Sequence, residues 1–147
     1  MKFYEASSTI RATPEAIWDI LTDAPSYTSW DNGVVRVEGR ILPAETIKVV
    51  SEANPGRTFP VKVSGWQPGE SMEWSGGMPL GLFRGVRTFS LRPAADGMTD
   101  FKVREEYTGL LLGMMWRSMP DLGPSFAKFA DGLKQHAESQ QAGGSDR

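Results

Sequence analysis

Arg87 and Glu105 are the residues whose types and positions best suit chemistry. Both lie in segments of alternating side chains, and the residues that share their parity are apolar or aromatic: Phe89, Leu91, Phe101, Val103 and Tyr107. If the two segments pair through the turn at 94–97, Arg87 faces Glu105 and both point toward the interior with their apolar neighbours. An unpaired buried charge costs about 3–5 kcal/mol, so the sequence predicts an inward-facing ion pair.

This ion pair has two interpretations. It is either a structural salt bridge in a cavity wall, or an anchor in which Arg87 binds the carboxylate, carbonyl or phenolate of an otherwise apolar ligand. A few polar groups in an apolar pocket fix the orientation of a ligand. The anchor hypothesis predicts that Arg87→Met weakens binding of an acidic ligand far more than binding of a neutral one.

Large aromatic and methionine side chains form a second set of candidates. Methionine adapts to varied ligand shapes, and three methionines cluster at 114–119, where the strand-rich part of the chain gives way to a helical pattern. Such side chains either pack a core or line a cavity. The candidate ligand-binding residues are therefore Arg87, Glu105, Tyr107, Trp66, Trp74, Met78, Phe83, Phe89, Met115, Trp116, Met119 and Phe126.

Other catalytic chemistries lack the residues that they need. The chain has no cysteine, which excludes disulfides, thiolate metal sites and cysteine nucleophiles. The only histidine, His136, is expected near the exposed end of the last helix, so we predict neither a Ser-His-Asp triad nor a metal site. The glycine-rich loop at 76–83 has no Walker lysine and is interpreted as a connection or a lid. We predict no catalytic residues, no metal and no cofactor.

Composition narrows the classes of partner. The 147 residues include 16 basic and 18 acidic side chains, and a net charge of −2 does not favour a nucleic-acid or acidic-membrane partner. The longest apolar stretch, 110–116, is too short to span a bilayer, and the first ten residues lack the apolar core of a signal peptide. We expect a cytoplasmic monomer or homodimer that binds a hydrophobic small molecule, with no nucleic acid and no membrane span.

The elements that must position these residues are short strands and a few helices. Thr13-Pro14-Glu15 predicts a capped helix after a first strand at 3–11, and a further turn is expected at 26–30. Apolar residues three and four apart predict a last helix, either kinked or split into one from about 111 and one at 124–138. Between these ends, strands are expected at 34–41, 46–50, 58–66, 71–75, 85–92 and 98–107.

The fold class predicted from this order is α+β. Consecutive strands joined by short turns predict an antiparallel meander, with one face covered by the last helix. We expect one ligand-binding domain over 1–138 and a disordered polar tail over 139–147.

The chain resembles the superfamily of START lipid-transfer domains, birch-pollen-type allergens and bacterial polyketide cyclase/dehydrase-like (SRPBCC) proteins. The likeness lies in TPEAIW at 13–18, the aromatic residues at 27–30, GVRTFSL at 85–91, DGMT at 96–99 and EYTGL at 106–110. It implies a helix-grip fold, in which a curved antiparallel sheet of about seven strands wraps around a long C-terminal helix, with a short N-terminal helical pair. Bacterial relatives often carry histidine where this chain has Arg87, so no role of that histidine is carried over.

Three functions are compatible with this resemblance. We predict that the protein binds or carries a lipid, quinone or polyketide-like molecule in an internal cavity. A cyclase or dehydratase would instead use Glu105 or Tyr107 to move protons and Arg87 to stabilise an enolate. A protein-interaction module of the chaperone-activating kind would need a large exposed apolar patch.

Overall fold

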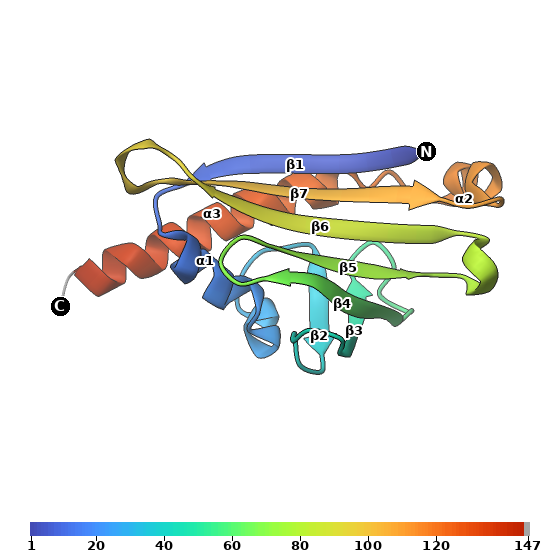
Figure 1. The fold of residues 1–147 in the computed structure, drawn as a ribbon, viewed down its shortest axis with the longest axis horizontal. Coiled ribbons are helices and arrows are strands. Elements are labelled where there is room, and N and C mark those ends of the chain that lie inside the picture. Colours follow the sequence, from blue (N-terminus) through green and yellow to red (C-terminus); the bar gives the residue numbers. More distant parts are fainter. Residues whose placement is uncertain (146–147) are drawn as a thin grey trace.

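The computed structural model describes residues 1–145 of the chain (Figure 1). A strand, a helical pair, six more strands and two helices follow one another, in the predicted order. The bounds are β1 (Lys2–Ile10), α1 (Pro14–Leu21), η1 (Ala24–Thr28), β2 (Val34–Glu38), β3 (Thr46–Ser51), β4 (Phe59–Gln67), β5 (Ser71–Gly77), η2 (Pro79–Gly81), β6 (Arg84–Pro93), η3 (Ala95–Gly97), β7 (Thr99–Thr108), α2 (Leu112–Ser118) and α3 (Gly123–Ser145), where η marks a 3-10 turn.

The described strands form one sheet in the order β1-β7-β6-β5-β4-β3-β2, and each neighbouring pair is antiparallel. This is the predicted meander, with β1 added beside β7. Helix α3 crosses one face of the sheet (Figure 1), which we call the inner face. The hydroxyl of Ser8 on β1 donates a 3.1 Å hydrogen bond to the carbonyl of Ala130 on α3 and joins the two layers. The helix-grip prediction is confirmed.

The N-terminal helical pair forms for the reasons that the sequence suggests. The Thr13 side chain accepts a hydrogen bond from the Ala16 N–H, and Pro14 occupies the first helical position. One face of α1 is buried, and Tyr27 in η1 donates a 2.7 Å hydrogen bond to the Leu21 carbonyl at the end of α1. The pair therefore covers the end of the sheet where β1 finishes.

The C-terminal helical region is split rather than kinked. Pro120 separates α2 from α3, because proline has no N–H for a helical hydrogen bond. Helix α3 continues to Ser145, so the prediction of a helix end at 138 and of a tail from 139 is wrong for 139–145. Gln140, Gln141 and Ala142 are good helix formers and no proline interrupts the stretch, although Gly143 and Gly144 are poor helix formers. The last two residues of the predicted tail, 146–147, lie outside the described residues.

The core lies between the inner face and α3. The buried apolar side chains described in α3 have the spacing predicted from the sequence, and they are Phe126, Phe129, Ala130, Leu133 and Ala137. Phe129 contacts rings from both the sheet and η1, including Phe89 at 5.6 Å and Tyr27 at 6.4 Å between centroids. The protein's own aromatic side chains thus fill the space under the middle of α3.

Candidate ligand-binding site

Four inner-face residues form a line across four adjacent strands, and we call them the interior row. Tyr4 on β1 is opposite Glu105 on β7, Glu105 is opposite Arg87 on β6, and Arg87 is opposite Trp74 on β5. The pairings of Arg87 with Glu105, Phe89 with Val103 and Leu91 with Phe101 are those predicted from the hairpin. The row therefore places one ion pair between two aromatic side chains.

The ion pair of the row is short and only partly exposed. Arg87 Nε lies 2.8 Å from Glu105 Oε1, and the two side chains are 21% and 20% exposed. The guanidinium also lies 4.6 Å from the centroid of the Phe126 ring on α3, at cation–π distance. Nε is the only side-chain group of Arg87 that donates a hydrogen bond to a described residue. Its two terminal Nη groups are free to bind an oxygen-rich group.

Two more donors lie beside the ion pair, and neither forms a hydrogen bond of ordinary length and angle within the described residues, although the Tyr107 hydroxyl lies near the Glu105 carboxylate. They are the Trp74 indole N–H and the Tyr107 hydroxyl, and both atoms are buried. Burial raises the pKa of Tyr107, and the charge of the nearby Glu105 carboxylate and a weak hydrogen bond to it raise that pKa further, so the hydroxyl stays protonated at ordinary pH. A buried donor without a partner costs about 1–3 kcal/mol. This cost is recovered if a ligand supplies an acceptor.

A glycine in β6, Gly85, makes room for the side chains of Glu105 and Tyr107. A Cβ on Gly85 would lie 2.7 Å from Glu105 Oε2 and 3.4 Å from the Tyr107 ring. Any side chain at this position would displace the carboxylate or the ring. Gly85 is thus required by the packing around the ion pair.

Aromatic rings surround the row at the end of the sheet nearest α2, and we call this group the mouth: Tyr4, Phe83, Tyr107, Trp116 and Phe126. The Trp116 ring on α2 stacks on Tyr4 at 5.1 Å and meets Tyr107 edge-on at 5.5 Å. Phe126 also stacks on Tyr4, at 5.6 Å, and Phe83 stacks on Tyr107 at 5.9 Å. Helix α2 has no fully buried residue, so these ring contacts are its main attachment.

The candidates named from the sequence do not all meet at this place. Arg87, Glu105, Tyr107, Trp74, Phe83, Trp116 and Phe126 belong to the row or the mouth. Phe89 is fully buried against Trp74 in the core, and Met115 and Met119 are half-buried at α2. Trp66 packs on Trp18 of α1 at 5.1 Å, toward the opposite end of the sheet. Met78 is 38% exposed in the loop before η2.

Tyr4 is the site residue that sequence reasoning missed. Its signal is the alternation in β1, where Tyr4 shares a face with Ala6, Ser8 and Ile10. His136 also differs from its predicted position. It lies well inside α3, half-buried, with its ring stacked on Trp30 at 5.9 Å, because the helix continues beyond it. Within 1–145, no group of three or more His, Asp or Glu side chains could hold a metal ion.

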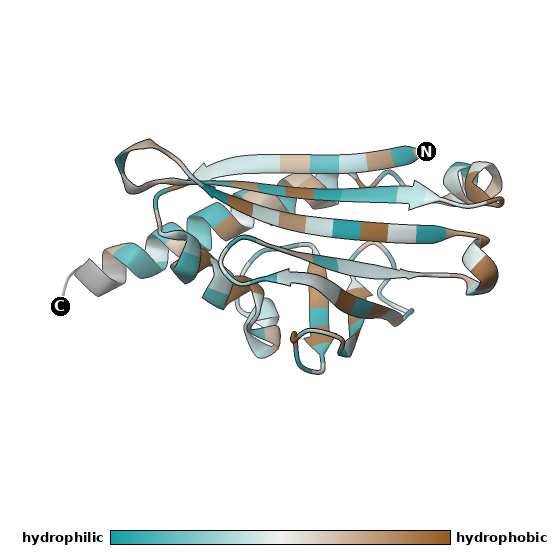
Figure 2. Cartoon of the chain, viewed as in Figure 1, coloured by the Kyte–Doolittle hydropathy of each residue, from teal (hydrophilic) through white to brown (hydrophobic). Residues whose placement is uncertain are grey.

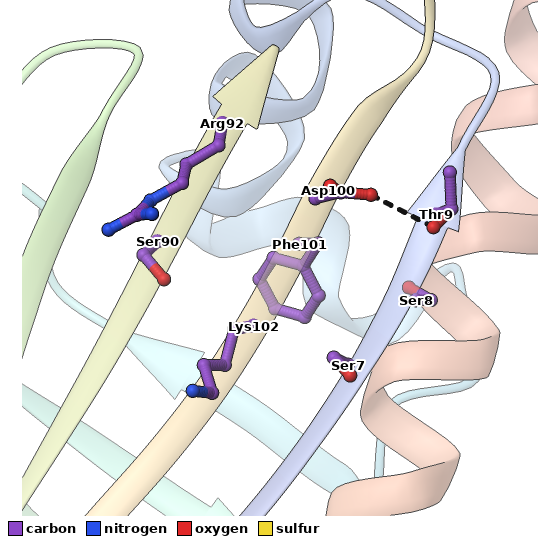
Figure 3. Close-up of a pocket in the computed structure, with 8 residues that line it drawn as sticks. All are labelled: Ser7, Ser8, Thr9, Ser90, Arg92, Asp100, Phe101 and Lys102. Carbon is purple, nitrogen blue, oxygen red and sulfur yellow. Dashed lines mark hydrogen bonds between the residues drawn. The ribbon is translucent and has the colours of Figure 1, made fainter. Parts of the chain in front are cut away.

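Two surface depressions are lined by other residues than the interior row. One, of about 540 Å³, is bordered by side chains of β1, β6 and β7 (Figure 3): Ser7, Ser8, Thr9, Ser90, Arg92, Asp100, Phe101 and Lys102. Asp100 in it already accepts a 2.9 Å hydrogen bond from Thr9. The other, of about 330 Å³, is bordered by Glu38, Lys48, Thr58 and Pro60. Both are polar and open, unlike the aromatic surroundings of the row.

The sheet, α3 and the helical pair define a protein with the helix-grip fold. The chain belongs to the family described as polyketide cyclase / dehydrase and lipid transport, whose model matches residues 2–138. No curated protein sequence matches the chain. None of the helices described in 1–145 is long and apolar enough to cross a membrane.

Solved structures share the fold at low sequence identity. The hypothetical protein jhp0584 from Helicobacter pylori has a TM-score of 0.75 at 11% identity, and the superposed region covers 92% of this chain and 88% of the Helicobacter chain. The Zhui aromatase/cyclase from Streptomyces has a TM-score of 0.71 at 12% identity, with 95% of each chain covered. A START superfamily protein from Mycobacterium smegmatis has a TM-score of 0.69 at 17% identity, covering 94% of this chain and 98% of its own.

Proposed function

We propose that this protein binds an amphipathic small molecule whose acidic or otherwise oxygen-bearing head group is held at the interior row. The observation that carries the proposal is the concentration of unused donors there. Arg87 has two Nη groups that donate to no described residue, the Trp74 indole N–H is buried without a partner, and the buried Tyr107 hydroxyl has only the Glu105 carboxylate beside it. A carboxylate or phenolate accepts several such hydrogen bonds at once, and charge makes each of them stronger.

The apolar body of the ligand is expected to extend from the row toward the mouth. In the other direction the interior is filled, since Phe89 and Met72 in the next inner-face pair are fully buried. Three rings of the mouth, those of Tyr4, Phe83 and Trp116, are half-buried and offer apolar contact. A few polar groups at the inner end of an aromatic pocket are typical of sites that orient an apolar ligand.

Entry requires the mouth to widen, and α2 is the element suited to move. It is seven residues long, has no fully buried residue, and is followed by Pro120 in a short link to α3. Displacing Trp116 from Tyr4 and Tyr107 would open the row to solvent. Elements with few buried contacts open at a lower free-energy cost than the core. In this proposal α2, rather than the loop 76–83, is the lid, and the loop is an ordinary connection, which was the other interpretation of its sequence.

The proposal is tested with a matched pair of probes, dodecanoate and 1-dodecanol. Calorimetric titration of the wild type should show tighter binding of dodecanoate, because only the acid carries a charge to pair with Arg87. Arg87→Met should weaken dodecanoate binding by about tenfold or more, the loss typical of one charged hydrogen bond, and dodecanol binding by about twofold or less. Native mass spectrometry of the freshly purified protein would show any ligand that it already carries.

Arg84→Met is the control variant. Arg84 is on the same strand but three positions away, so its side chain points to the opposite face of the sheet and is exposed. The Arg84→Met variant should bind dodecanoate and dodecanol as tightly as the wild type does. Equal losses of the two probes in Arg87→Met would contradict the anchor role and leave Arg87–Glu105 as a structural ion pair.

The alternative of a cyclase or dehydratase has less support from the site. Its proton-moving candidates are Glu105, which accepts a hydrogen bond from Arg87, and Tyr107, whose raised pKa keeps the hydroxyl protonated. Tyr107 is therefore suited to donate a hydrogen bond but not to act as a base. The likeness to the aromatase/cyclase, at 12% identity, concerns the fold alone.

A further inference from the structure

Four exposed apolar side chains gather at the end of the molecule beside the mouth. They are Leu80 (96% exposed), Leu110 (90%), Met114 (55%) and Met78 (38%), and we call them the tip patch. They come from the η2 loop and from the start of α2, which project beyond the strand ends at the right of Figure 1. Figure 2 shows the same end with hydrophobic residues in both segments.

The backbone holds these side chains outward. The Leu111 N–H donates a 2.8 Å hydrogen bond to the Leu82 carbonyl, and the Met78 N–H donates one of 2.7 Å to the Phe83 carbonyl, so the two loops are tied together. Leu80 has φ 62° and ψ 20°, a left-handed conformation that leucine rarely adopts. A leucine that is almost fully exposed in a strained conformation gains nothing from the fold, and such strain is typical of functional positions.

The charges around the tip patch have one sign. The segments 78–84 and 108–119 contain Arg84 and Arg117 and no acidic residue. Lys2 adds a third cation, with Nζ 5.9 Å from the centroid of the Trp116 ring on α2. The acids that come next along β7 are already paired, Glu105 with Arg87 and Glu106 with Arg104. Beyond α2, Asp121 accepts a hydrogen bond from the Gly123 N–H.

We propose that the tip patch docks on the surface of an anionic lipid bilayer. Exposed leucine and methionine side chains enter the boundary between head groups and acyl chains, while flanking cations pair with anionic head groups. A second copy of the chain is a poorer occupant, because a symmetric contact would bring the same three cations together. The whole-chain charge of −2 gave no sign of this surface, since it averages over the local distribution.

The inference goes beyond the proposed function and does not depend on it, because vesicle binding is measured without any ligand. The two proposals are linked by location, because the tip patch borders α2 and the mouth. Docking would bring the mouth against the bilayer, where amphipathic acids reside.

The test is co-sedimentation of the full chain with sucrose-loaded vesicles made of equal parts phosphatidylcholine and phosphatidylglycerol. The wild type should bind these vesicles and bind pure phosphatidylcholine less, and added salt should weaken binding. The double variant Leu80→Ser/Leu110→Ser should lose at least about tenfold in binding, because it removes most of the apolar area available for insertion. Arg117→Gln should weaken binding to the anionic vesicles only.

Matched controls lie elsewhere on the surface. Leu42 is 42% exposed in the β2–β3 connection, and Arg92 is exposed at the opposite end of β6 from Arg84. Leu42→Ser and Arg92→Gln should bind as the wild type does. The proposal is overturned if the wild type does not sediment with anionic vesicles, or if the controls lose as much as the tip variants. It is also overturned if the double variant abolishes a wild-type dimer in solution without changing vesicle binding, which would assign the patch to self-association.

Discussion

At the scale of single residues, the interior row combines satisfied and unsatisfied polar groups. Two buried tyrosines show the contrast. Tyr27 donates to the Leu21 carbonyl at 2.7 Å, whereas the Tyr107 hydroxyl forms no hydrogen bond of ordinary length and angle and has only the Glu105 carboxylate near it. The first hydroxyl stabilises the fold, and the second destabilises it until an acceptor arrives.

The two tyrosines should therefore respond to the same substitution with opposite signs. Tyr27→Phe should lower the free energy of unfolding by about 1–2 kcal/mol, because a buried hydrogen bond is lost and a carbonyl is left unpaired. Tyr107→Phe should leave it unchanged or raise it by up to about 1 kcal/mol. Urea denaturation monitored by circular dichroism measures both. A loss in Tyr107→Phe as large as that in Tyr27→Phe would show that the hydroxyl is bonded in solution.

How far these residues can be predicted depends on how local their pairing is. Arg87 and Glu105 belong to one hairpin, and a short turn with alternating apolar residues sets their register. Tyr4 joins Glu105 across about a hundred residues of chain, and no local pattern names β7 as the partner of β1. The unpaired state of the Trp74 and Tyr107 donors depends on packing in three dimensions, which no sequence pattern reports.

At the scale of elements, the attachment of α3 depends on a glycine within the helix. A Cβ on Gly132 would occupy the position of the Asp31 backbone carbonyl, so only glycine lets this loop approach α3. Gly113 in α2 is the opposite case, since a Cβ there would meet nothing within 4 Å. A substitution at Gly132 therefore tests close packing, whereas the same substitution at Gly113 tests helix propensity alone.

Alanine substitution at the two positions should give opposite results. Gly132→Ala should destabilise the protein by about 2 kcal/mol or more, because the overpacking cost exceeds the roughly 1 kcal/mol that alanine gains in a helix. Gly113→Ala should be neutral or stabilising by up to about 1 kcal/mol. Thermal unfolding of the two variants beside the wild type measures this. If Gly132→Ala were as stable as Gly113→Ala, the close approach of Asp31 would be wrong.

A carboxylate provides a second attachment of α3, six residues after Gly132. Glu138 accepts hydrogen bonds from the Lys134 Nζ at 2.8 Å and from the Arg11 N–H at 2.9 Å, which ties α3 to the end of β1. These two bonds lower the pKa of Glu138 from its ordinary 4.5. A carboxyl whose pKa is lower in the folded state stabilises the fold above its unfolded pKa, and that contribution disappears as the pH falls through the folded value.

Glu138→Gln should therefore change the acid side of the stability profile. At neutral pH the variant should be less stable than the wild type by on the order of 1 kcal/mol or less, since the side chain is partly exposed. The difference should shrink as the pH falls below 4.5, the ordinary pKa of the group, because the wild type then loses the same interactions. Urea midpoints measured from pH 7 to pH 3 (roughly the range over which carboxylates titrate) would show this convergence. A difference that does not depend on pH would contradict it.

Element boundaries were predictable where a residue type forces them. Thr13 and Pro14 start α1, and Pro120 separates α2 from α3. The end of α3 was not predictable in this way, because no proline marks it and the helix continues through a polar stretch that includes Gly143 and Gly144, past the last buried apolar side chain named in the core, Ala137. The position of His136 was missed for the same reason.

At the scale of the whole molecule, the two ends of the sheet differ in how tightly they are closed. At the end where β1 finishes, α1 is held by four buried residues, Ile17, Trp18, Ile20 and Leu21. At the end where β1 begins, α2 has no fully buried residue, although it is nearly as long. Burial of apolar side chains contributes roughly 1.5–3 kcal/mol each, so α1 should be much harder to open than α2.

Hydrogen exchange should show this difference directly. Amides of α2 should exchange at least about a hundredfold faster than those of α1 and of the middle of α3, because local opening of α2 breaks few contacts. Dodecanoate should slow exchange in α2 and in the adjacent residues 78–83 and leave α1 unchanged, since a bound acid would fix Trp116 over the row. Exchange in α2 as slow as in α1 would contradict its role as the moving element. A general slowing that includes α1 would instead indicate stabilisation of the whole fold without a preferred entrance.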